Sequence, residues 1–291
     1  MNDLIQINVR NSGEIKIQHI GIDVLNKAID ESMRQLARQN NMDVKIYPLM
    51  TGYIQLDKGA YITPGKDYGT KVKVPTWAFL VTVGKEKILV DTGMSATEIA
   101  AWHHPGSYQP EGFRIDERLR KLGVGVGEID TVIFTHLHWD HCSNMKLFGN
   151  ARFYVHKKEL EFAQDPHVLY YKSYESKRLG ITPPFDGVSF RTVDMEFQFN
   201  EVLTIFPTPG HCPGHQSVSV QTDGGVYVIA GDAVFADENM EPDERCNLPF
   251  TPMGRYVSVF DMFSSMELVF DKADHILTGH GNKVSQQPVY P

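Results

Sequence analysis

Four strong metal-binding side chains lie within the heptapeptide THLHWDH, residues 135–141. The apolar run at 132–134 directly before it predicts a buried strand, so the ligands would leave the strand end and enter the next turn. The four side chains are His136, His138, Asp140 and His141. Imidazole and carboxylate ligands together suit zinc, iron or manganese better than calcium or magnesium. A chain with this loop is expected to fold around a transition-metal site.

Three later residues have the same setting and can complete such a site: His211, Asp232 and His280. Each comes after a short apolar run that predicts a strand, and each has a neighbouring glycine. Glycine lets the backbone approach an ion closely. The repeated placement at strand ends predicts that folding gathers these side chains around the loop at 135–141.

These motifs resemble those of the metallo-β-lactamase superfamily, from about Trp77 to Gly281. The family's HxHxDH loop is present, its later His, Asp and His follow in the expected order, and Asp91-Thr92-Gly93 matches its earlier turn. The resemblance implies an α/β fold, an αββα sandwich of two mixed sheets with helices outside. It also implies that Asp91 orients neighbouring loops through hydrogen bonds, with a role as an eighth ligand the less favoured option.

The resemblance further implies how two divalent ions would be held. His136, His138 and His211 would bind one ion, Asp140, His141 and His280 the second, and Asp232 would bridge them. Zinc is the expected metal, with iron, manganese or cobalt as alternatives. The nearby Cys142 and Cys212 are expected to be packing residues, because the nitrogen and oxygen ligand set is already complete.

A chain of 291 residues, 42% of them apolar, suits one large domain with an N-terminal extension. Apolar residues at helical spacing predict an amphipathic helix at 22–36 within an extension over 1–45. The hydrolase domain would then cover 46–291, with an aromatic-rich insertion near 165–194 that either roofs the site or anchors to the domain. A homodimer through the helix at 22–36 is one option.

Charge and cysteine content limit the partners and the setting. The net charge of −8 argues against a nucleic-acid surface, which is normally basic. The N-terminus lacks an export signal and no apolar run reaches membrane-spanning length, so no membrane partner is expected. Three cysteines do not suit a disulfide framework. A cytoplasmic protein is the expectation.

Local patterns predict most of the secondary structure. Strands are expected at 44–47, 76–83, 88–90, 152–155, 202–206, 217–220 and 226–229, and helices at 115–122, 157–163 and 259–270. Residues 93–113 read as a long loop. Its paired His103 and His104 are expected at the surface, with a substrate-facing position as the alternative.

Two metal ions can share a water and lower its pKa, which makes a bridging hydroxide available at neutral pH. The predicted reaction is hydrolysis, with Asp140 as the catalytic group that passes a proton to the leaving group. The residues 138–141, 208–217 and 231–233 make the chain similar to quorum-quenching N-acyl homoserine lactonases. This similarity implies a small lactone substrate, with another lactone, an ester or a glyoxalase II-like thioester as alternatives, and a catalytically silent sensor as a further one. Phe235 departs from that group, because many members have a tyrosine there.

Overall fold

The computed structural model describes residues 4–9, 15–20 and 43–291. The chain falls into two units, residues 1–42 and 43–291. In the first unit, β1 (Leu4–Val9) pairs antiparallel with β2 (Ile15–Ile20). The helix predicted at 22–36 lies outside the described residues.

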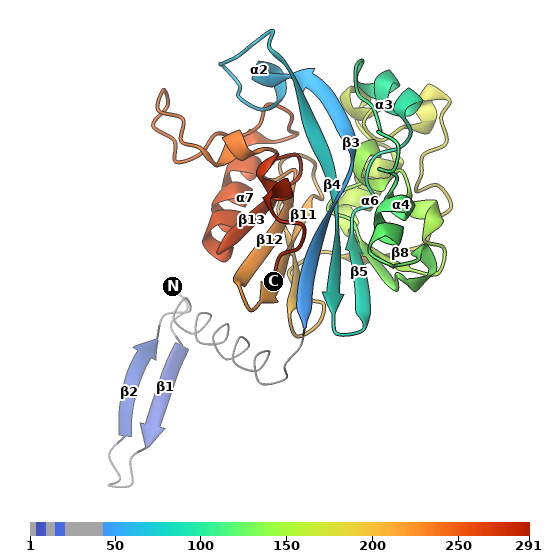
Figure 1. Ribbon diagram of the computed structural model, residues 1–291. Coiled ribbons are helices and arrows are strands. Elements are labelled where there is room, and N and C mark those ends of the chain that lie inside the picture. Colours follow the sequence, from blue (N-terminus) through green and yellow to red (C-terminus); the bar gives the residue numbers. More distant parts are fainter. Residues whose placement is uncertain (1–3, 10–14, 21–42) are drawn as a thin grey trace. The chain divides into compact units, whose positions relative to one another are not determined.

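Two mixed sheets form the centre of the second unit (Figure 1). The six-stranded sheet has the order β3-β4-β5-β6-β7-β8 and contains β3 (Val44–Asp57), β4 (Lys71–Val83), β5 (Glu86–Val90), β6 (Thr131–Ile133), β7 (Arg152–His156) and β8 (Phe190–Val193). The five-stranded sheet has the order β13-β12-β11-β10-β9 and contains β9 (Phe197–Gln198), β10 (Leu203–Pro207), β11 (Gln216–Thr222), β12 (Gly225–Gly231) and β13 (His275–Thr278). Each sheet combines antiparallel and parallel pairs.

Helices cover the outer faces of both sheets. In Figure 1, α7 lies beyond the five-stranded sheet, and α4 and α6 lie beyond the six-stranded sheet. The α-helices are α2 (Lys58–Tyr61), α3 (Thr97–His103), α4 (Ile115–Lys121), α5 (Trp139–Cys142), α6 (Lys157–Gln164) and α7 (Val259–Lys272). Short 3-10 turns occupy Val126–Glu128, Met145–Leu147, Val168–Tyr170, Lys177–Leu179, Asp237–Met240 and Lys283–Gln286. This arrangement confirms the predicted αββα sandwich. None of the helices described is long and apolar enough to cross a membrane.

Burial on both faces explains why the central strands are so apolar. Residues 74–81 of β4 are all buried, because helices pack on one face of the sheet and the second sheet packs on the other. Leu80 lies in a core cluster with Leu119 of α4. Val228 of β12 lies in a second cluster with Met262 and Met266 of α7. Each such side chain contributes about 1.5–3 kcal/mol through burial, so both helix layers are held firmly against the sheets.

Two strands are longer than the sequence pattern predicts. Pro48 and Gly52 interrupt the pattern of β3, yet the strand runs to Asp57, with a register shift at Met50/Gly52. Because β3 is the edge strand of its sheet, it tolerates a proline. Pro75 lies in a part of β4 that pairs only with β3, since β5 ends with Val90 opposite Phe79.

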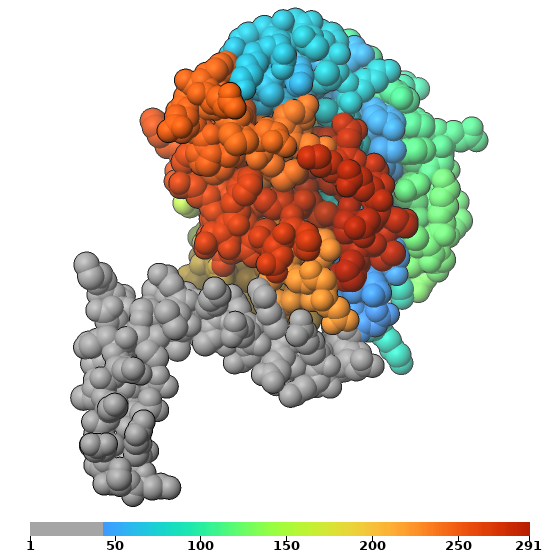
Figure 2. All heavy atoms as spheres, turned by 60° about the vertical axis from the view of Figure 1, so that its left-hand side comes forward, coloured from blue at the N-terminus to red at the C-terminus, as the bar shows by residue number. Residues whose placement is uncertain are grey.

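Segments distant in sequence meet beside the carboxyl ends of the strands. Figure 2 shows the α2 region (cyan), the 240–255 segment (orange) and the C-terminal segment (red) side by side on one face. Asn239 Nδ2 donates to Ile62 O at 2.9 Å, and Gly254 N donates to Tyr61 O at 2.8 Å. These bonds fix Tyr61 next to the segment that contains Met253, and both residues line the pocket described below.

The segment at 93–113 is not the uninterrupted loop that was predicted, because α3 occupies Thr97–His103. This helix is short, and its buried residues are Ala100 and His103 while Ile99 and Trp102 are exposed. The apolar pattern therefore does not match the buried face. In the expected insertion, residues 168–170 and 177–179 form 3-10 turns, whereas 190–193 joins the six-stranded sheet as β8.

Candidate metal centre

The seven predicted ligands all lie beyond strand ends and converge on one buried place. His136 and His138 follow β6, and Asp140 and His141 belong to α5 directly after that loop. The remaining three ligands follow β10, β12 and β13 and are His211, Asp232 and His280. All seven are buried, and none of these residues is more than 7% exposed. Folding therefore brings together residues that are up to 144 positions apart in sequence (280 − 136).

The ligand atoms form three overlapping groups, in each of which they lie within 4.8 Å of one another. The groups are His136, His138 and His211; His136, His141 and Asp232; and Asp140, His141 and His280. The first and third groups share no residue. The cluster is therefore compatible with two ions, one in the first group and one in the third.

Asp232 lies between the two sides of the cluster. Its Oδ2 is 3.3 Å from His211 Nε2 and 3.9 Å from His136 Nε2. Its Oδ1 is 3.4 Å from His141 Nε2 and 3.3 Å from His280 Nε2. One carboxylate oxygen thus faces each histidine pair, which is the arrangement that a bridging ligand requires.

Hydrogen bonds set the tautomer of three of the imidazoles. His211 Nδ1 lies 2.8 Å from the carbonyl oxygen of Arg255, and His280 Nδ1 lies 2.8 Å from that of Pro75. His141 Nδ1 lies 2.8 Å from Asp91 Oδ2. A carbonyl or carboxylate oxygen accepts, so each Nδ1 carries a proton and each Nε2 is the nitrogen that faces the cluster.

The same logic extends to His136 through Thr135. Thr135 Oγ1 donates to Asp91 Oδ2 at 2.7 Å, so it accepts from His136 Nδ1 at 3.0 Å. Asp91 Oδ1 also accepts from Thr135 N at 2.8 Å. Asp91 sits behind the ligands at φ 59°, a strained backbone region that is common at functional sites. These bonds agree with the orienting role predicted for Asp91.

Buried atoms without partners show that the cluster fits divalent cations. In the described part of the chain, Nε2 of His136, His141 and His280 and Oδ1 of Asp232 are buried without a hydrogen-bond partner, while His138 Nδ1 lies 2.9 Å from His211 Nε2. Each unmet group costs about 1–3 kcal/mol. Ligand atoms about 2.1 Å from a tetrahedral zinc lie about 3.4 Å apart, close to the 3.3–3.5 Å that separates His141 Nε2 or His280 Nε2 from Asp140 and Asp232 oxygens.

Electrostatics favour the metal-coordinating forms of His136, His138 and Asp232. Burial is the main cause that lowers the pKa of His136 and of His138 well below the usual value, so both are neutral. Burial alone would raise the pKa of Asp232, but His280, His141 and His211 outweigh it and hold that pKa well below its usual range. The carboxylate of Asp232 is therefore ionised. Burial lowers the pKa of His141, but the carboxylates of Asp140, Asp232 and Asp91 outweigh it and raise that pKa well above its usual value, so a bound ion would displace a proton from its Nε2.

His215 positions Asp232, a role the sequence did not reveal. Its Nε2 accepts from Asp232 N at 3.0 Å, so its Nδ1 donates to Thr208 Oγ1 at 2.8 Å, and this hydroxyl lies 2.8 Å from Ser217 Oγ. Burial lowers the pKa of His215 to about 3, which keeps the accepting nitrogen free. Gly279 has no room for a side chain, because a Cβ there would lie 2.4 Å from Asp232 Oδ1.

Glu159 of α6 supports the metal loop from behind and was also missed. Its Oε1 accepts from Leu137 N at 2.9 Å and from Tyr174 Oη at 2.8 Å. Leu137 stands between two ligands, so this buried carboxyl group fixes the loop. Cys142 and Cys212 are fully buried in the adjacent core cluster, as predicted for packing residues.

A pocket opens above the cluster. Its lining comes from the end of β3, α2, α3, the metal loop, the 169–173 segment and the loop before α7. The lining residues are Ile54, Leu56, Tyr61, His103, His104, His138, Trp139, Asp140, Leu169, Lys172, Ser173, His211, Asp232, Phe235, Met253 and Arg255. The expected insertion therefore contributes to the pocket wall, while its Tyr170 and Tyr174 are buried in the core.

The surface position predicted for His103 is wrong. This residue is 5% exposed, its Nε2 lies 3.0 Å from Glu175 Oε1, and its ring stacks on Trp139 with centroids 4.1 Å apart. The pattern gave no sign of this, because Glu175 is 72 positions away. His104 has the alternative, pocket-facing position. Burial is the main cause that lowers the pKa of His104 to about 4, so it is neutral at pH 7.

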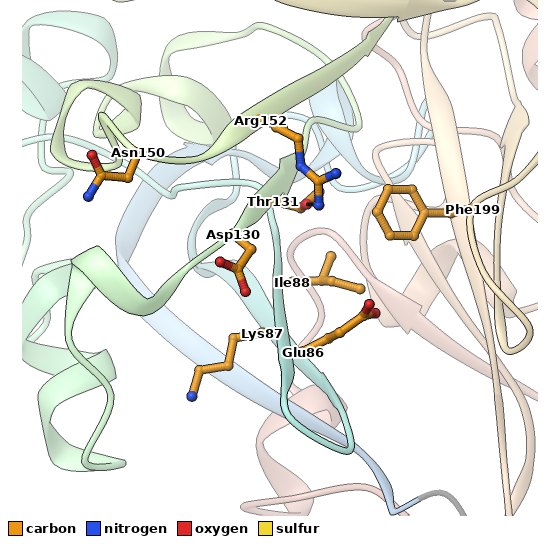
Figure 3. A pocket seen from close by; sticks show the side chains of 8 residues that line it. All are labelled: Glu86, Lys87, Ile88, Asp130, Thr131, Asn150, Arg152 and Phe199. Atoms are coloured by element: carbon orange, nitrogen blue, oxygen red, sulfur yellow. Dashed lines mark hydrogen bonds between the residues drawn. The ribbon is translucent and has the colours of Figure 1, made fainter. Parts of the chain in front are cut away.

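A second hollow lies at the opposite, amino-terminal ends of β5, β6 and β7 (Figure 3). Its side chains come from residues 86–88, 130–131, 150, 152 and 199. Lys87 pairs with Glu128 at 3.1 Å, and Arg152 Nη2 donates to Thr131 Oγ1 at 3.2 Å. None of the described residues that line this hollow belongs to one of the three groups of potential metal ligands.

Two mixed sheets between helices, with a His/Asp cluster compatible with two ions at the strand ends, define the architecture of a dinuclear metalloprotein. Residues 72–280 match the family described as the metallo-beta-lactamase superfamily, and the chain belongs to it. The predicted family is thereby confirmed.

Among known proteins, the chain is similar to the N-acyl homoserine lactonase of Bacillus cereus, with 24% identity over 252 residues that cover 81% of this chain and 92% of the relative. The N-acyl homoserine lactonase AttM of Azorhizobium caulinodans is 28% identical over 207 residues, 66% of this chain and 77% of the relative. A solved N-acyl homoserine lactone hydrolase with N-hexanoyl-L-homoserine bound at its catalytic metal center shares the fold, with a TM-score of 0.66, 24% identity, and coverage of 83% of this chain and 95% of that chain.

Proposed function

We propose that the protein is a dinuclear metal-dependent hydrolase that opens lactone rings, with N-acyl homoserine lactones as the leading substrates. The observation that carries this proposal is the buried cluster of seven histidine and aspartate side chains at the floor of a pocket. The relatives named as N-acyl homoserine lactonases support the choice of a lactone.

The ligand roles follow from the three groups described above. His136, His138 and His211 would hold one ion, Asp140, His141 and His280 the other, and Asp232 would bridge them. Zinc is the proposed metal because histidine and aspartate are its usual nitrogen and oxygen ligands, and iron, manganese and cobalt accept the same donors. A bound pair of such ions supplies an activated water and an electrophilic centre for the carbonyl group.

The chain's own residues would orient the substrate and handle the proton. Asp140 lines the pocket, with its Oδ2 3.4 Å from His280 Nε2, and is proposed to pass a proton to the leaving alkoxide. Phe235 has no hydroxyl, and its ring lies 4.3 Å from that of His280. Either the bound metal alone would polarise the substrate carbonyl, or another side chain would donate the hydrogen bond. Apart from the ligands and the stacked pair His103 and Trp139, the uncharged donors on the pocket lining are Tyr61, His104 and Ser173.

Because Phe235 lacks the hydroxyl group that many of these lactonases have, the alternative substrates are another lactone, an ester or a thioester. Tyr68, Tyr170, Tyr174 and Tyr256 could each supply a hydroxyl, but none of them is among the residues that line the pocket in the described part of the chain. Tyr170 Oη donates to Tyr256 O at 2.6 Å, and Tyr174 Oη is bound to Glu159. A homodimer and a cytoplasmic location stay predictions.

A substrate panel on metal-loaded protein tests the proposal. Ring opening is followed by proton release for homoserine lactones of several acyl lengths and for other lactones, and thiol release is followed for S-lactoylglutathione. His211→Ala and Asp232→Asn are expected to abolish turnover and reduce bound metal, whereas His275→Ala, at an exposed histidine of β13, should change neither. Turnover of the thioester alone would reject the lactonase assignment, and no turnover of any substrate would reject hydrolysis.

A further inference from the structure

Two cations line the pocket above the metal cluster, and both are held in place by neutral groups. Lys172 Nζ donates to His103 O at 2.9 Å and lies 5.0 Å from the centre of the Trp102 ring. Arg255 Nη2 donates to Leu169 O at 2.9 Å, and its guanidinium lies 4.3 Å from the centre of the Tyr170 ring.

Neither cation has a carboxylate partner within 4.0 Å in the described ranges, although the chain carries a net charge of −8. Elsewhere a comparable arginine is neutralised, since Arg245 Nη2 lies 2.6 Å from Asp243 Oδ2. The carboxylates on the pocket lining are Asp140 and Asp232, and both face imidazoles of the cluster at 3.3–3.9 Å. Two positively charged side chains thus line a pocket in which both carboxylates contact the histidines of the cluster and neither pairs with Lys172 or Arg255.

We propose that Lys172 and Arg255 bind a carboxylate at the end of the substrate remote from the reacting ester, so that the preferred substrates are lactones with an anionic tail. This inference rests on the proposed lactonase function and narrows its substrate class. A neutral acyl chain would leave the two charges partly desolvated and unpaired on binding, which is unfavourable.

The contacts already made by each cation leave donors for such a carboxylate. Arg255 uses Nη2 for Leu169 O and Ser173 Oγ, so its Nε–H and Nη1–H groups remain to donate single charge-assisted hydrogen bonds to a carboxylate oxygen. Lys172 has three ammonium protons and uses one for His103 O. Apolar lining from Ile54 and Met253 offers a surface for the methylene groups between the lactone and the tail.

Two matched series of substrates measure the effect of the negative charge on the tail. The first series is the N-succinyl, N-glutaryl and N-adipoyl homoserine lactones, each with a free terminal carboxylate. The second series has the same chain lengths with a terminal primary amide, which is nearly isosteric and uncharged. At low salt, kcat/KM is expected to be about tenfold higher for the best carboxylate than for its amide, because hydrogen bonds between charged partners are stronger than those of a neutral amide. The ratio should shrink as ionic strength rises, because salt screens partly exposed charges.

Substitutions assign the preference to the two side chains. Arg255→Gln and Lys172→Gln should each lower the carboxylate-to-amide ratio towards one, mainly through KM, and Arg255→Lys should restore part of it. The controls are Arg152→Gln, in the hollow of Figure 3, and Lys121→Gln, whose Nζ also donates to a carbonyl oxygen, that of Gly112 at 3.0 Å. Both controls should keep the wild-type ratio.

A binding readout separates this inference from the lactonase proposal. Lactam analogues with the same two tails are titrated calorimetrically into metal-loaded protein, and the carboxylate analogue should bind about tenfold more tightly. Turnover of both series at equal kcat/KM would overturn the anion site and leave the lactonase function standing. A preference that survives Arg255→Gln and Lys172→Gln would also overturn it. If no lactone reacts, the lactonase function fails, and equal affinity for the two lactams would then overturn the anion site as well.

Discussion

Replacement of Asp91 by asparagine tests whether the hydrogen bonds behind the ligands control metal binding. Asp91 Oδ2 accepts from both Thr135 Oγ1 and His141 Nδ1, at 2.7 and 2.8 Å. In Asp91→Asn an amide nitrogen at this position faces two donors. A hydrogen bond to a charged acceptor contributes about 1.5–3 kcal/mol, so loss of both with partial rearrangement is expected to cost about 3 kcal/mol of unfolding free energy.

The same substitution should weaken metal binding, because His141 can relieve the conflict by moving its proton from Nδ1 to Nε2, the atom that faces the cluster. Loss of such a supporting partner typically lowers metal affinity about 10–100-fold. Competition with a zinc-binding dye measures the affinity, and urea unfolding of metal-free protein measures the stability. Asp116→Asn, which removes exposed ion pairs with Arg114 and Arg120, serves as the control and should change neither quantity appreciably. Wild-type metal affinity in Asp91→Asn would refute the reasoning.

Four further predictions address the ligand cluster and its surroundings. Phe235→Tyr should raise lactone kcat at least about tenfold, because an oxyanion donor is worth about 2.7–4 kcal/mol elsewhere; an unchanged kcat would show that the hydroxyl is not limiting. Gly279→Ala should reduce bound metal, since its Cβ would lie 2.4 Å from Asp232 Oδ1, whereas Gly127→Ala, with open space around it, should bind metal normally. Chelation should abolish turnover and lower Tm, and added zinc should restore both, because the buried ligand atoms regain partners; a chelated protein with full activity would contradict this. His215 has a folded pKa of about 3 against 6.5 when unfolded, so the unfolded chain binds more protons and metal-free protein should lose stability as pH falls below 6.5. His215→Gln should flatten that pH dependence in urea titrations, and an unaltered slope would count against it.

The convergence of the seven side chains could be predicted from the sequence because each of them has a recognisable local pattern of residue types. The HxHxDH loop and its strand are contiguous, and His211, Asp232 and His280 each follow an apolar run that reads as a strand. The family resemblance supplied the αββα sandwich, which the structure confirms (Figure 1).

The surroundings of the ligands could not be predicted, because they depend on contacts between distant positions. His280 Nδ1 is fixed by Pro75 O, which is 205 positions away, and backbone carbonyls have no sequence signature. His103 reads as a loop residue until Glu175 and Trp139 are folded against it. Lys172 and Arg255 are 83 positions apart (255 − 172), so only the folded pocket places them together.

Anomalous diffraction from a crystal of zinc-loaded protein, collected at the zinc absorption edge, tests the central claim most directly. The account predicts two peaks per chain, one beside His136, His138 and His211 and the other beside Asp140, His141 and His280, with Asp232 between them. Absence of both peaks from this cluster, or zinc bound only elsewhere in the chain, would contradict it.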